Sequence, residues 1–392
     1  MRPAICLAQE VGTRLGRRQV LQRRLSPGER LAVPRENEMK PAWTDLMIPA
    51  GEHDERPGRY PTTMDAGLPN LLPPADDHWP AQLARKLAAL ASQGIYLGTS
   101  SWKYPGWLGG LYTEDRYRYR GKLSDTRFQQ HCLEEYATVF PTVGVDATYY
   151  TFPTEKFARG LVAQVPAHFR FSFKVTDHVT VKRYPPLPRH GEFAGQPNPG
   201  FLDAELFRRE FLEPLEPIRE SVGLVMFEFS RFHAQDFARG RDFVRALDHF
   251  LGDLPGGWRY GVEVRNRSFL HPDFFALLAA HGVAYLFNQW SDGPSLDAQL
   301  AQPGCWTAHF AGARLLTRPG TDYEEREQQL QPFDRVREPF PEARAATVRL
   351  IRDARQRGVP LFAHLGNKLE GCATLTAATL VDELADDGAA AA

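Results

Sequence analysis

Eight short apolar runs, separated by stretches with helical periodicity, constrain the fold of this chain more than any other feature. An apolar run of about four to eight residues, bounded by turn-forming or polar residues, is typical of a buried strand. Between the runs lie amphipathic segments such as "FVRALDHFLGDL" and "ARAATVRLIRDARQRG". Strands are predicted at residues 95–99, 143–149, 169–175, 222–228, 259–264, 283–287, 305–310 and 359–364.

This alternation favours a closed barrel over an open sheet. Eight strand–helix units over about 290 residues match a single TIM (β/α)8 barrel, which is an α/β fold. The competing doubly wound sheet usually carries a Gly-rich phosphate-binding turn after its first strand. Here the first strand continues into "GTSSWKYPGW", which lacks the G-x-G-x-x-G pattern. We therefore predict a TIM barrel, whose active site would lie at the C-terminal ends of the strands.

The barrel does not account for the whole chain of 392 residues. Residues 1–75 mix both charge signs with many prolines and little apolar periodicity, so they cannot bury enough apolar area to offset the entropy of ordering. We predict a largely disordered, flexible N-terminal extension over 1–75 and an amphipathic lead-in helix over 76–92. The barrel domain is assigned to 93–385, and residues 386–392 are expected to form a disordered tail.

Composition excludes some environments and partners. The formal net charge is −1, so no global field attracts the chain to nucleic acid or to a membrane. The chain contains no run of about 18 apolar residues, so no transmembrane helix is predicted. The four cysteines are far apart in the sequence, as is typical of free thiols in a reducing compartment. We expect a cytoplasmic protein without membrane contact.

The segment "GVEVRNRSF" holds the most informative pair of charges. Glu263 and Arg265 are two residues apart, so they share one face of a strand. They either form a scaffold ion pair, or Glu263 is a catalytic acid/base beside an arginine that grips phosphate or carboxylate. Lys174 ends "FRFSFKV" and either reaches solvent or acts as a catalytic cation aimed at the substrate. If the three groups converge, one cation is left over, and an anionic ligand would balance it.

Other side chains at the predicted strand ends complete a candidate ligand site. Trp102 has an alternative role in an aromatic cap that seals the barrel rim. His309 and His364, together with carboxylates at the strand ends, could instead bind a divalent metal ion. Because no local metal-binding spacing such as H-E-x-x-H is present, we predict neither a metal site nor a cofactor. Besides Arg265, the predicted ligand-binding residues are Trp102, Asp146, Tyr150, Asn288, His309 and Asn367.

Several ordered motifs make residues 95–384 resemble the YecE-like family, also called domain of unknown function 72. The motifs are "LGTSSWKYPGW", "VGVDATYYTFP", "FRFSFKV", "GVEVRNRSF", and "ARLLTRPGTDYEE" followed by "LGNKLEG". The resemblance implies a TIM barrel and a pocket, but no established reaction. Relatives usually carry glutamate and asparagine at Gly144 and Asp146, asparagine at Gly366 and proline at Thr374. These departures bear on the affinity or chemistry of that pocket.

Three classes of function remain open at this stage. The first is a metal-independent enzyme that acts on a small anionic substrate. The second is a nucleic-acid-binding or nucleic-acid-processing protein, by analogy with TIM-barrel endonucleases. The basic loops 116–120 and 182–190 favour this second class, and the near-zero net charge opposes it. The third is a barrel that binds a ligand or a partner without catalysis.

Overall fold

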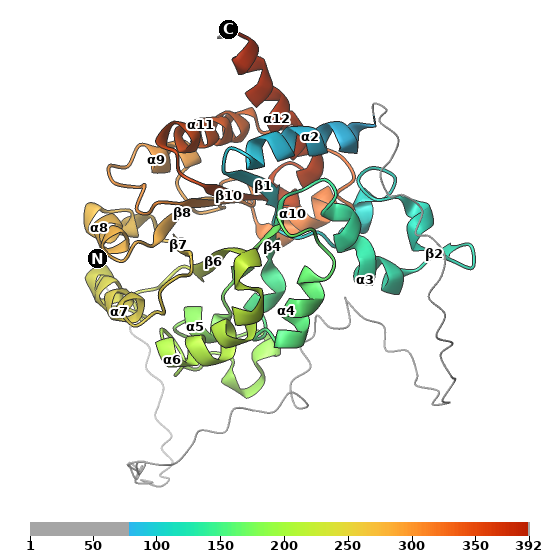
Figure 1. Ribbon diagram of the computed structural model, residues 1–392. Coiled ribbons are helices and arrows are strands. Elements are labelled where there is room, and N and C mark those ends of the chain that lie inside the picture. The colour runs from blue at the N-terminus through green and yellow to red at the C-terminus, as the bar shows by residue number, and fades with distance from the viewer. Residues whose placement is uncertain (1–77, 391–392) are drawn as a thin grey trace, which may run out of the picture.

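The computed structural model describes residues 78–390, with side chains through Ala385, and shows a closed barrel of eight parallel strands (Figure 1). The barrel closes because β1 pairs with both β10 and β4. The predicted TIM barrel is confirmed. In barrel order, the strands are β1 (Ile95–Thr99), β10 (Leu361–Leu365), β9 (Ala311–Leu315), β8 (Ala284–Gln289), β7 (Tyr260–Val264), β6 (Val222–Phe229), β5 (Arg170–Lys174) and β4 (Thr142–Val145).

Helices surround the barrel, and local sequence signals set where several of them begin and end. The Ser124 side chain accepts a hydrogen bond from the Arg127 backbone N–H and so caps α3. Gly358, at φ 65°, ends α11 in the left-handed conformation that glycine adopts at little cost. The helices are α2 (Trp79–Ala91), α3 (Asp125–Tyr136), α4 (Glu155–Val162), α5 (Asp177–Thr180), α6 (Ala204–Phe207), α7 (Gly240–Gly252), α8 (Pro272–Ala280), α9 (Leu296–Leu300), α10 (Tyr323–Leu330), α11 (Pro341–Arg357) and α12 (Ala373–Ala390).

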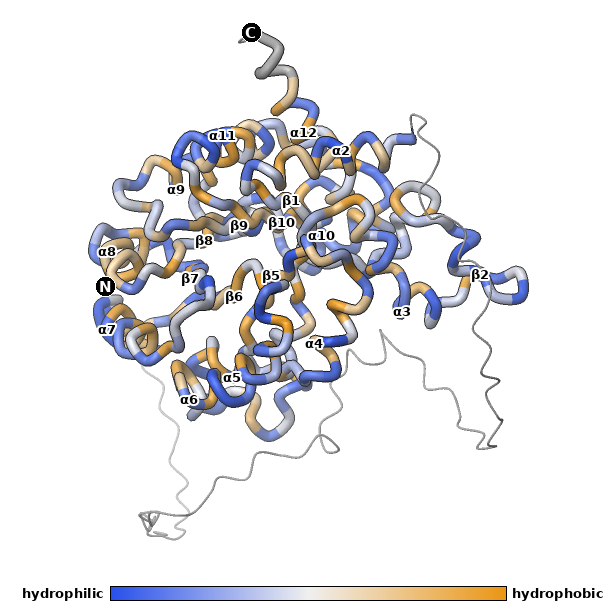
Figure 2. Tube along the Cα trace, in the orientation of Figure 1, coloured by the Kyte–Doolittle hydropathy of each residue, from blue (hydrophilic) through white to orange (hydrophobic). Residues whose placement is uncertain are grey.

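The surrounding helices bury one face against the strands. In α7 the buried side chains are Phe243, Leu247, Phe250 and Leu251, which recur at helical spacing. Figure 2 shows hydrophobic and hydrophilic residues alternating along such helices. Within the residues that the structure describes, no helix combines the length and the hydrophobicity that crossing a membrane requires.

The inside of the barrel has an apolar level and a polar level. A Cβ atom at Gly312 would lie 2.5 Å from Leu286 Cδ2, so glycine there makes room for the apolar level. Because side chains alternate along a strand, residues two positions further along point to the same side. The polar level therefore lies at the C-terminal ends of the strands. The apolar level is a separate buried cluster of Leu224, Met226, Ala284, Leu286 and Phe362.

The seventh barrel strand is β9, so the strand predicted at 305–310 is wrong. In that segment, the Thr307 hydroxyl accepts a hydrogen bond from the Tyr285 backbone N–H, a side-chain contact outside the strand ladder. The true strand reads "AGARL", which lacks the β-branched and aromatic residues that indicate a strand. His309 therefore precedes its strand and is exposed. It lies at the opposite end of the barrel from the predicted ligand site.

Other boundaries also differ from those in the sequence analysis. β4 ends at Val145, and a 3-10 turn over Asp146–Tyr149 replaces the last part of the predicted strand. Helix α12 continues to Ala390, into the range 386–392 that was expected to be a tail, and the high helix propensity of alanine favours this continuation. The predicted extension over 1–75 lies outside the described residues.

Candidate functional site

A layer of polar side chains closes the C-terminal end of the barrel. The strand register puts Glu228 beside Glu263, and Arg314 between Asn288 and His364. Charged residues are rarely buried without a partner, so this layer requires internal ion pairs. Its members, one from each of β5 to β10, are Lys174, Glu228, Glu263, Asn288, Arg314 and His364, none more than 9% exposed.

Arg314 is the centre of this layer. Its Nη1 donates hydrogen bonds to Glu228 Oε2 at 2.7 Å and to Glu263 Oε2 at 2.8 Å. Its Nη2 donates to Asp146 Oδ1 at 3.2 Å. Burial alone lowers the pKa of Arg314, but the three carboxylates outweigh burial and raise this pKa well above its usual range. The charged guanidinium therefore joins β6 and β7 to the turn that follows β4.

Glu228 is bound by three cations. Lys174 Nζ lies 2.7 Å from Oε2, Arg265 Nη2 lies 2.8 Å from Oε1, and Arg314 completes the set. Burial raises the pKa of Glu228, yet the three cations lower it well below its usual range. Burial lowers the pKa of Lys174, and the Glu228 carboxylate partly opposes that change. Lys174 is therefore the cation of this group that loses its proton most readily.

Aromatic rings fix two of the cations. The Arg265 guanidinium carbon lies 3.4 Å from the centroid of the Trp290 ring, and Lys174 Nζ lies 3.6 Å from the centroid of the Tyr149 ring. Contacts of this kind contribute about 0.5–2 kcal/mol each, more when water is excluded. The positions of both cations are therefore set by the ring faces as well as by Glu228.

Three cations and three carboxylates balance in this group, so the prediction that one cation is left over is wrong. We call the group the charge cluster: Lys174, Arg265 and Arg314 with Asp146, Glu228 and Glu263. The prediction from the sequence included only Lys174, Glu263 and Arg265. Among the carboxylates, the Asp146 side chain is 37% exposed, whereas those of Glu228 and Glu263 are 3% and 0% exposed. Asp146 is therefore the carboxylate of the cluster that faces solvent.

His364 is a poorly satisfied polar group inside the barrel. It is 1% exposed, and neither ring nitrogen makes a hydrogen bond of normal geometry, although the Ala313 backbone lies close. Burial and, next, the nearby Arg314 charge lower the pKa of His364 to about 3. The folded protein keeps this ring neutral, while an unfolded chain protonates it below about pH 6.5. Stability should therefore fall as the pH drops from about 6.5 towards 3.

Replacing His364 with leucine should remove this loss of stability at low pH. Leucine leaves no unsatisfied nitrogen, so the free energy of unfolding at pH 7 should be unchanged or higher, with a smaller loss between about pH 6.5 and 4. Urea denaturation followed by circular dichroism at several pH values measures both effects. The control His249→Leu, on the exposed side of α7, should keep the wild-type pH dependence. A loss of more than about 2 kcal/mol at pH 7 in His364→Leu would contradict this interpretation.

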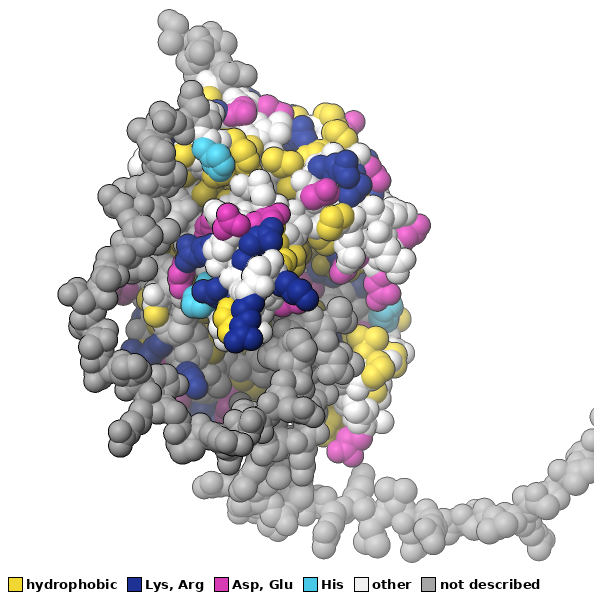
Figure 3. Space-filling view, turned by 90° about the vertical axis from the view of Figure 1, so that its right-hand side faces the viewer, with side chains coloured by type: hydrophobic (Ala, Val, Ile, Leu, Met, Phe, Trp, Pro, Cys, Tyr) yellow, Lys and Arg dark blue, Asp and Glu magenta, His cyan; other side chains and the backbone are white. Residues whose placement is uncertain are grey.

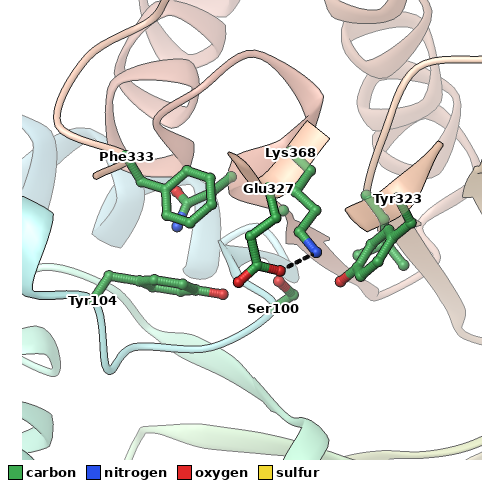
Figure 4. Close-up of a pocket in the computed structure, with 9 residues that line it drawn as sticks. Ser100, Tyr104, Tyr323, Glu327, Phe333 and Lys368 are labelled. Carbon is green, nitrogen blue, oxygen red and sulfur yellow. Dashed lines mark ion pairs between the residues drawn. The ribbon is translucent and has the colours of Figure 1, made fainter. Parts of the chain in front are cut away.

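A pocket opens beside the charge cluster, between loops that follow the adjacent strands β1, β10 and β9. It encloses about 380 Å3, part of which is open to solvent. Lys368 Nζ lies 2.5 Å from Glu327 Oε2, and Figure 4 shows this ion pair between Tyr104 and Tyr323. The lining residues are Ser100, Tyr104, Leu316, Tyr323, Glu327, Phe333, Gly366, Asn367 and Lys368.

The structure brings some of the predicted site residues together. Lys174, Asp146, Glu263 and Arg265 all belong to the charge cluster. Asn288 lies in the same polar layer, where its Nδ2 donates to the Leu286 carbonyl at 3.3 Å.

The other predicted ligand residues have different surroundings. Trp102 is buried in the hydrophobic core. Tyr150 is 40% exposed, and the Arg189 guanidinium carbon lies 4.9 Å from the centroid of its ring. Asn367 lines the pocket, and its Oδ1 accepts a hydrogen bond from the Ala373 backbone N–H at the start of α12. His309 lies at the far end of the barrel.

Arg314 was not among the residues predicted from the sequence, although its side chain contacts all three carboxylates of the cluster. Because the seventh strand was placed too early, Arg314 did not fall on a strand. The available signal was a charge two residues after Gly312 in an otherwise apolar run, which puts both on the inner face. Glu228 ends a correctly predicted strand, but a lone glutamate there did not reveal its three partners.

The carboxylates of the cluster bind a guanidinium. Asp146, Glu228 and Glu263 all contact Arg314. In the part of the chain that the structure describes, no group of three or more His, Cys, Asp and Glu side chains is arranged to hold a metal ion. His364, which the sequence analysis considered as a metal ligand, is the neighbour of Arg314 across the sheet.

The sequence model of one protein family, described as "Protein of unknown function DUF72", matches residues 96–391. The chain belongs to this family. The DUF72 resemblance of the sequence motifs is thereby confirmed. Among curated relatives, "UPF0759 protein YecE" of Escherichia coli (strain K12) is 29% identical over 182 residues, which are 46% of this chain and 50% of that protein. The chain thus spans about half the length of the curated relatives that it matches.

Solved structures of other DUF72 proteins are similar to this chain. One from Thermotoga maritima has a TM-score of 0.49 and 20% identity, covering 74% of this chain and 99% of that one. One from Enterococcus faecalis has a TM-score of 0.49 and 19% identity, covering 74% of this chain and 95% of that one.

Proposed function

We propose that the C-terminal face of this barrel binds a small molecule that carries a phosphate or carboxylate group. The observation that carries the proposal is the position of Asp146 on Arg314. Asp146 is the most exposed of the three carboxylates on that guanidinium and makes the longest contact, 3.2 Å against 2.7 and 2.8 Å. A ligand anion that displaced Asp146 would accept a hydrogen bond from Nη2 of this buried guanidinium and keep its charge paired.

Within this proposal, Lys174 is the acid/base that the geometry favours. Its ammonium group shares Glu228 with Arg314, and its burial lowers its pKa, which brings proton exchange closer to neutral pH. Glu263, the acid/base expected from the sequence, is 0% exposed and is bound to Arg314. We assign Glu263 to positioning the guanidinium. The chemistry that fits these residues is proton transfer without a metal ion.

Replacing Lys174 with methionine tests the anion site, because its ammonium group and the Arg314 guanidinium lie on the same oxygen of Glu228 and would face the same anion. Inorganic phosphate at constant ionic strength should raise the Tm of the wild-type protein in a saturable way. The variant should bind phosphate at least about tenfold more weakly, because a charge-assisted hydrogen bond contributes about 1.5–3 kcal/mol. Calorimetric titration measures the affinity, and Lys156→Met, at an exposed position of α4, is the matched control. Equal phosphate affinity in Lys174→Met and wild type would contradict the proposal.

A second candidate is binding to nucleic acid through the hairpin of β2 (Arg118–Tyr119) and β3 (Lys122–Leu123). Tyr119 is 57% exposed, and the Arg120 guanidinium carbon lies 5.2 Å from the centroid of its ring. Figure 3 views the molecule from the side on which the hairpin lies and shows Lys and Arg side chains gathered there, with Asp and Glu side chains beside them. An exposed aromatic ring among cations suits stacking on bases. Salt-dependent binding to mixed oligonucleotides would favour this candidate over the first.

A further inference from the structure

We infer that the pocket beside the charge cluster holds a neutral, hydroxyl-bearing ring of the same ligand, which would make the ligand class a sugar phosphate or sugar acid. This inference rests on the proposed function, because the charge cluster supplies the anion site. It adds a second compartment with different chemistry. The contacts within the pocket, the surface that it presents and its connection to the cluster each support it.

The charges in the pocket cancel, which favours a neutral group. Lys368 and Glu327 form an ion pair at 2.5 Å, so the pocket presents both a donor and an acceptor without net charge. Lys368 is only 7% exposed, and its Nζ lies 3.1 Å from the centroid of the Tyr323 ring. This ammonium group is therefore held in one position. A rigid donor–acceptor pair is suited to a ligand that offers both kinds of group, as a hydroxyl does.

Hydroxyl and aromatic groups complete the lining. Figure 4 shows the Tyr104 hydroxyl, the Ser100 hydroxyl and the Tyr323 hydroxyl around the Lys368–Glu327 pair. The Phe333 ring packs against the Tyr104 ring with centroids 5.7 Å apart and adds an apolar wall. Small-molecule sites typically combine such apolar walls with a few convergent polar groups. A ring with polar edges and a C–H face fits this combination better than a purely apolar group.

An unpartnered amide adds to the polar capacity of the pocket. Asn367 lines the pocket and is 3% exposed, with its Oδ1 engaged by the Ala373 backbone N–H. Its Nδ2 has no hydrogen-bond partner. Since a buried unsatisfied donor costs about 1–3 kcal/mol, a ligand hydroxyl that accepts from this amide would recover part of that cost.

Packed aromatic side chains connect the pocket to the charge cluster. The Tyr323 ring lies 5.1 Å from the Trp290 ring, and Trp290 in turn contacts the Arg265 guanidinium at 3.4 Å. The other wall includes Ser100, which lines the pocket and lies against β4, because a Cβ atom at Gly144 would be 3.2 Å from the Ser100 carbonyl oxygen. Asp146 follows Gly144 by two residues. The anion site and the pocket therefore share a wall, and one small molecule can occupy both.

The experiment compares four probes by calorimetric titration of the full chain: inorganic phosphate, phenyl phosphate, ribose 5-phosphate and glucose 6-phosphate. At least one sugar phosphate should bind about tenfold or more tightly than both inorganic phosphate and phenyl phosphate. Glu327→Gln should remove this preference and leave the affinity for inorganic phosphate within about twofold of wild type. Glu325→Gln, at an exposed position of the same helix, should keep the preference.

The possible failures are distinguishable. If inorganic phosphate binds but neither sugar phosphate binds more tightly, or phenyl phosphate binds as tightly as the sugar phosphates, the pocket inference is overturned and the proposed function stands. The same holds if Glu327→Gln keeps the full preference. If none of the four probes binds, the proposed function fails, and the inference fails with it. A crystal structure with the preferred sugar phosphate should place its ring between Tyr104 and Tyr323.

Discussion

Replacing Arg314 with leucine should lower the free energy of unfolding by about 3–5 kcal/mol, the usual result of removing one partner from a buried ion pair. The loss is expected to be large because Glu263 is 0% exposed and would keep only Arg265, whose Nε lies 3.5 Å from its Oε1. Glu228 would keep Lys174 and Arg265. Chemical denaturation followed by circular dichroism measures the change.

Two further variants distinguish the loss of the Arg314 ion pairs from the loss of any arginine side chain. Arg245→Leu, at an exposed position of α7, should change the free energy of unfolding by no more than about 0.5 kcal/mol. Arg314→Lys keeps the charge but loses the planar fork that reaches three carboxylates, so an intermediate loss is expected. If Arg314→Leu lost less than about 1 kcal/mol, the polar layer would not be closed to water as its burial indicates.

The fold could be predicted from the sequence because barrel strands are buried on both sides. A strand such as β6 is apolar at seven of the eight positions in "VGLVMFEF", counting glycine, and such a run stands out from the polar loops around it. The sequence of β9 gave no such signal, because Ala311, Gly312 and Ala313 are small residues selected by close packing. Leu286 and Leu224 fill the space at Gly312. Tertiary packing had overridden strand propensity there.

The candidate site was predictable only in part. Glu263 and Arg265 could be recognised because their spacing puts both on one side of a strand. Their partners come from other strands, since Arg314 is 51 residues from Glu263 in the sequence. The barrel order determines which strands are neighbours. The contacts between particular side chains and carboxylates depend in addition on strand register and on side-chain rotamers. The charge balance was therefore outside the reach of sequence reasoning.

The polar layer that closes the C-terminal end of the barrel links the stability of the protein to anion binding. The interior below the layer is apolar, so the cluster has water on one side only, where Asp146 lies. If the negative charge of an inner carboxylate is removed, another negative charge can reach the cluster only from that side. An anion from solvent can take the place of the lost carboxylate. The anion site can therefore be tested without a known substrate.

Replacing Glu228 with glutamine should destabilise the protein by about 3 kcal/mol and make its stability strongly dependent on phosphate. Glutamine keeps the shape of the side chain but removes the carboxylate that pairs with Lys174, Arg265 and Arg314, so the cluster gains one net positive charge. If phosphate binds at this site, a concentration about 100 times its Kd should restore about 2.7 kcal/mol. Thermal denaturation at matched ionic strength, with phosphate replacing chloride, measures the recovery.

The pH dependence of this recovery identifies the cation involved. Glu228 is the first of the groups that raise the pKa of Lys174 against the effect of burial, so this pKa should fall further in Glu228→Gln. Since the ammonium is needed to hold the anion, the phosphate effect should weaken as the pH rises through the lowered pKa of Lys174. Glu220→Gln, at an exposed position, should show neither the loss of stability nor a phosphate effect larger than that of the wild type. If phosphate did not raise the stability of Glu228→Gln, the cluster would be a closed scaffold, and the ligand site would then have to lie elsewhere on the barrel rim.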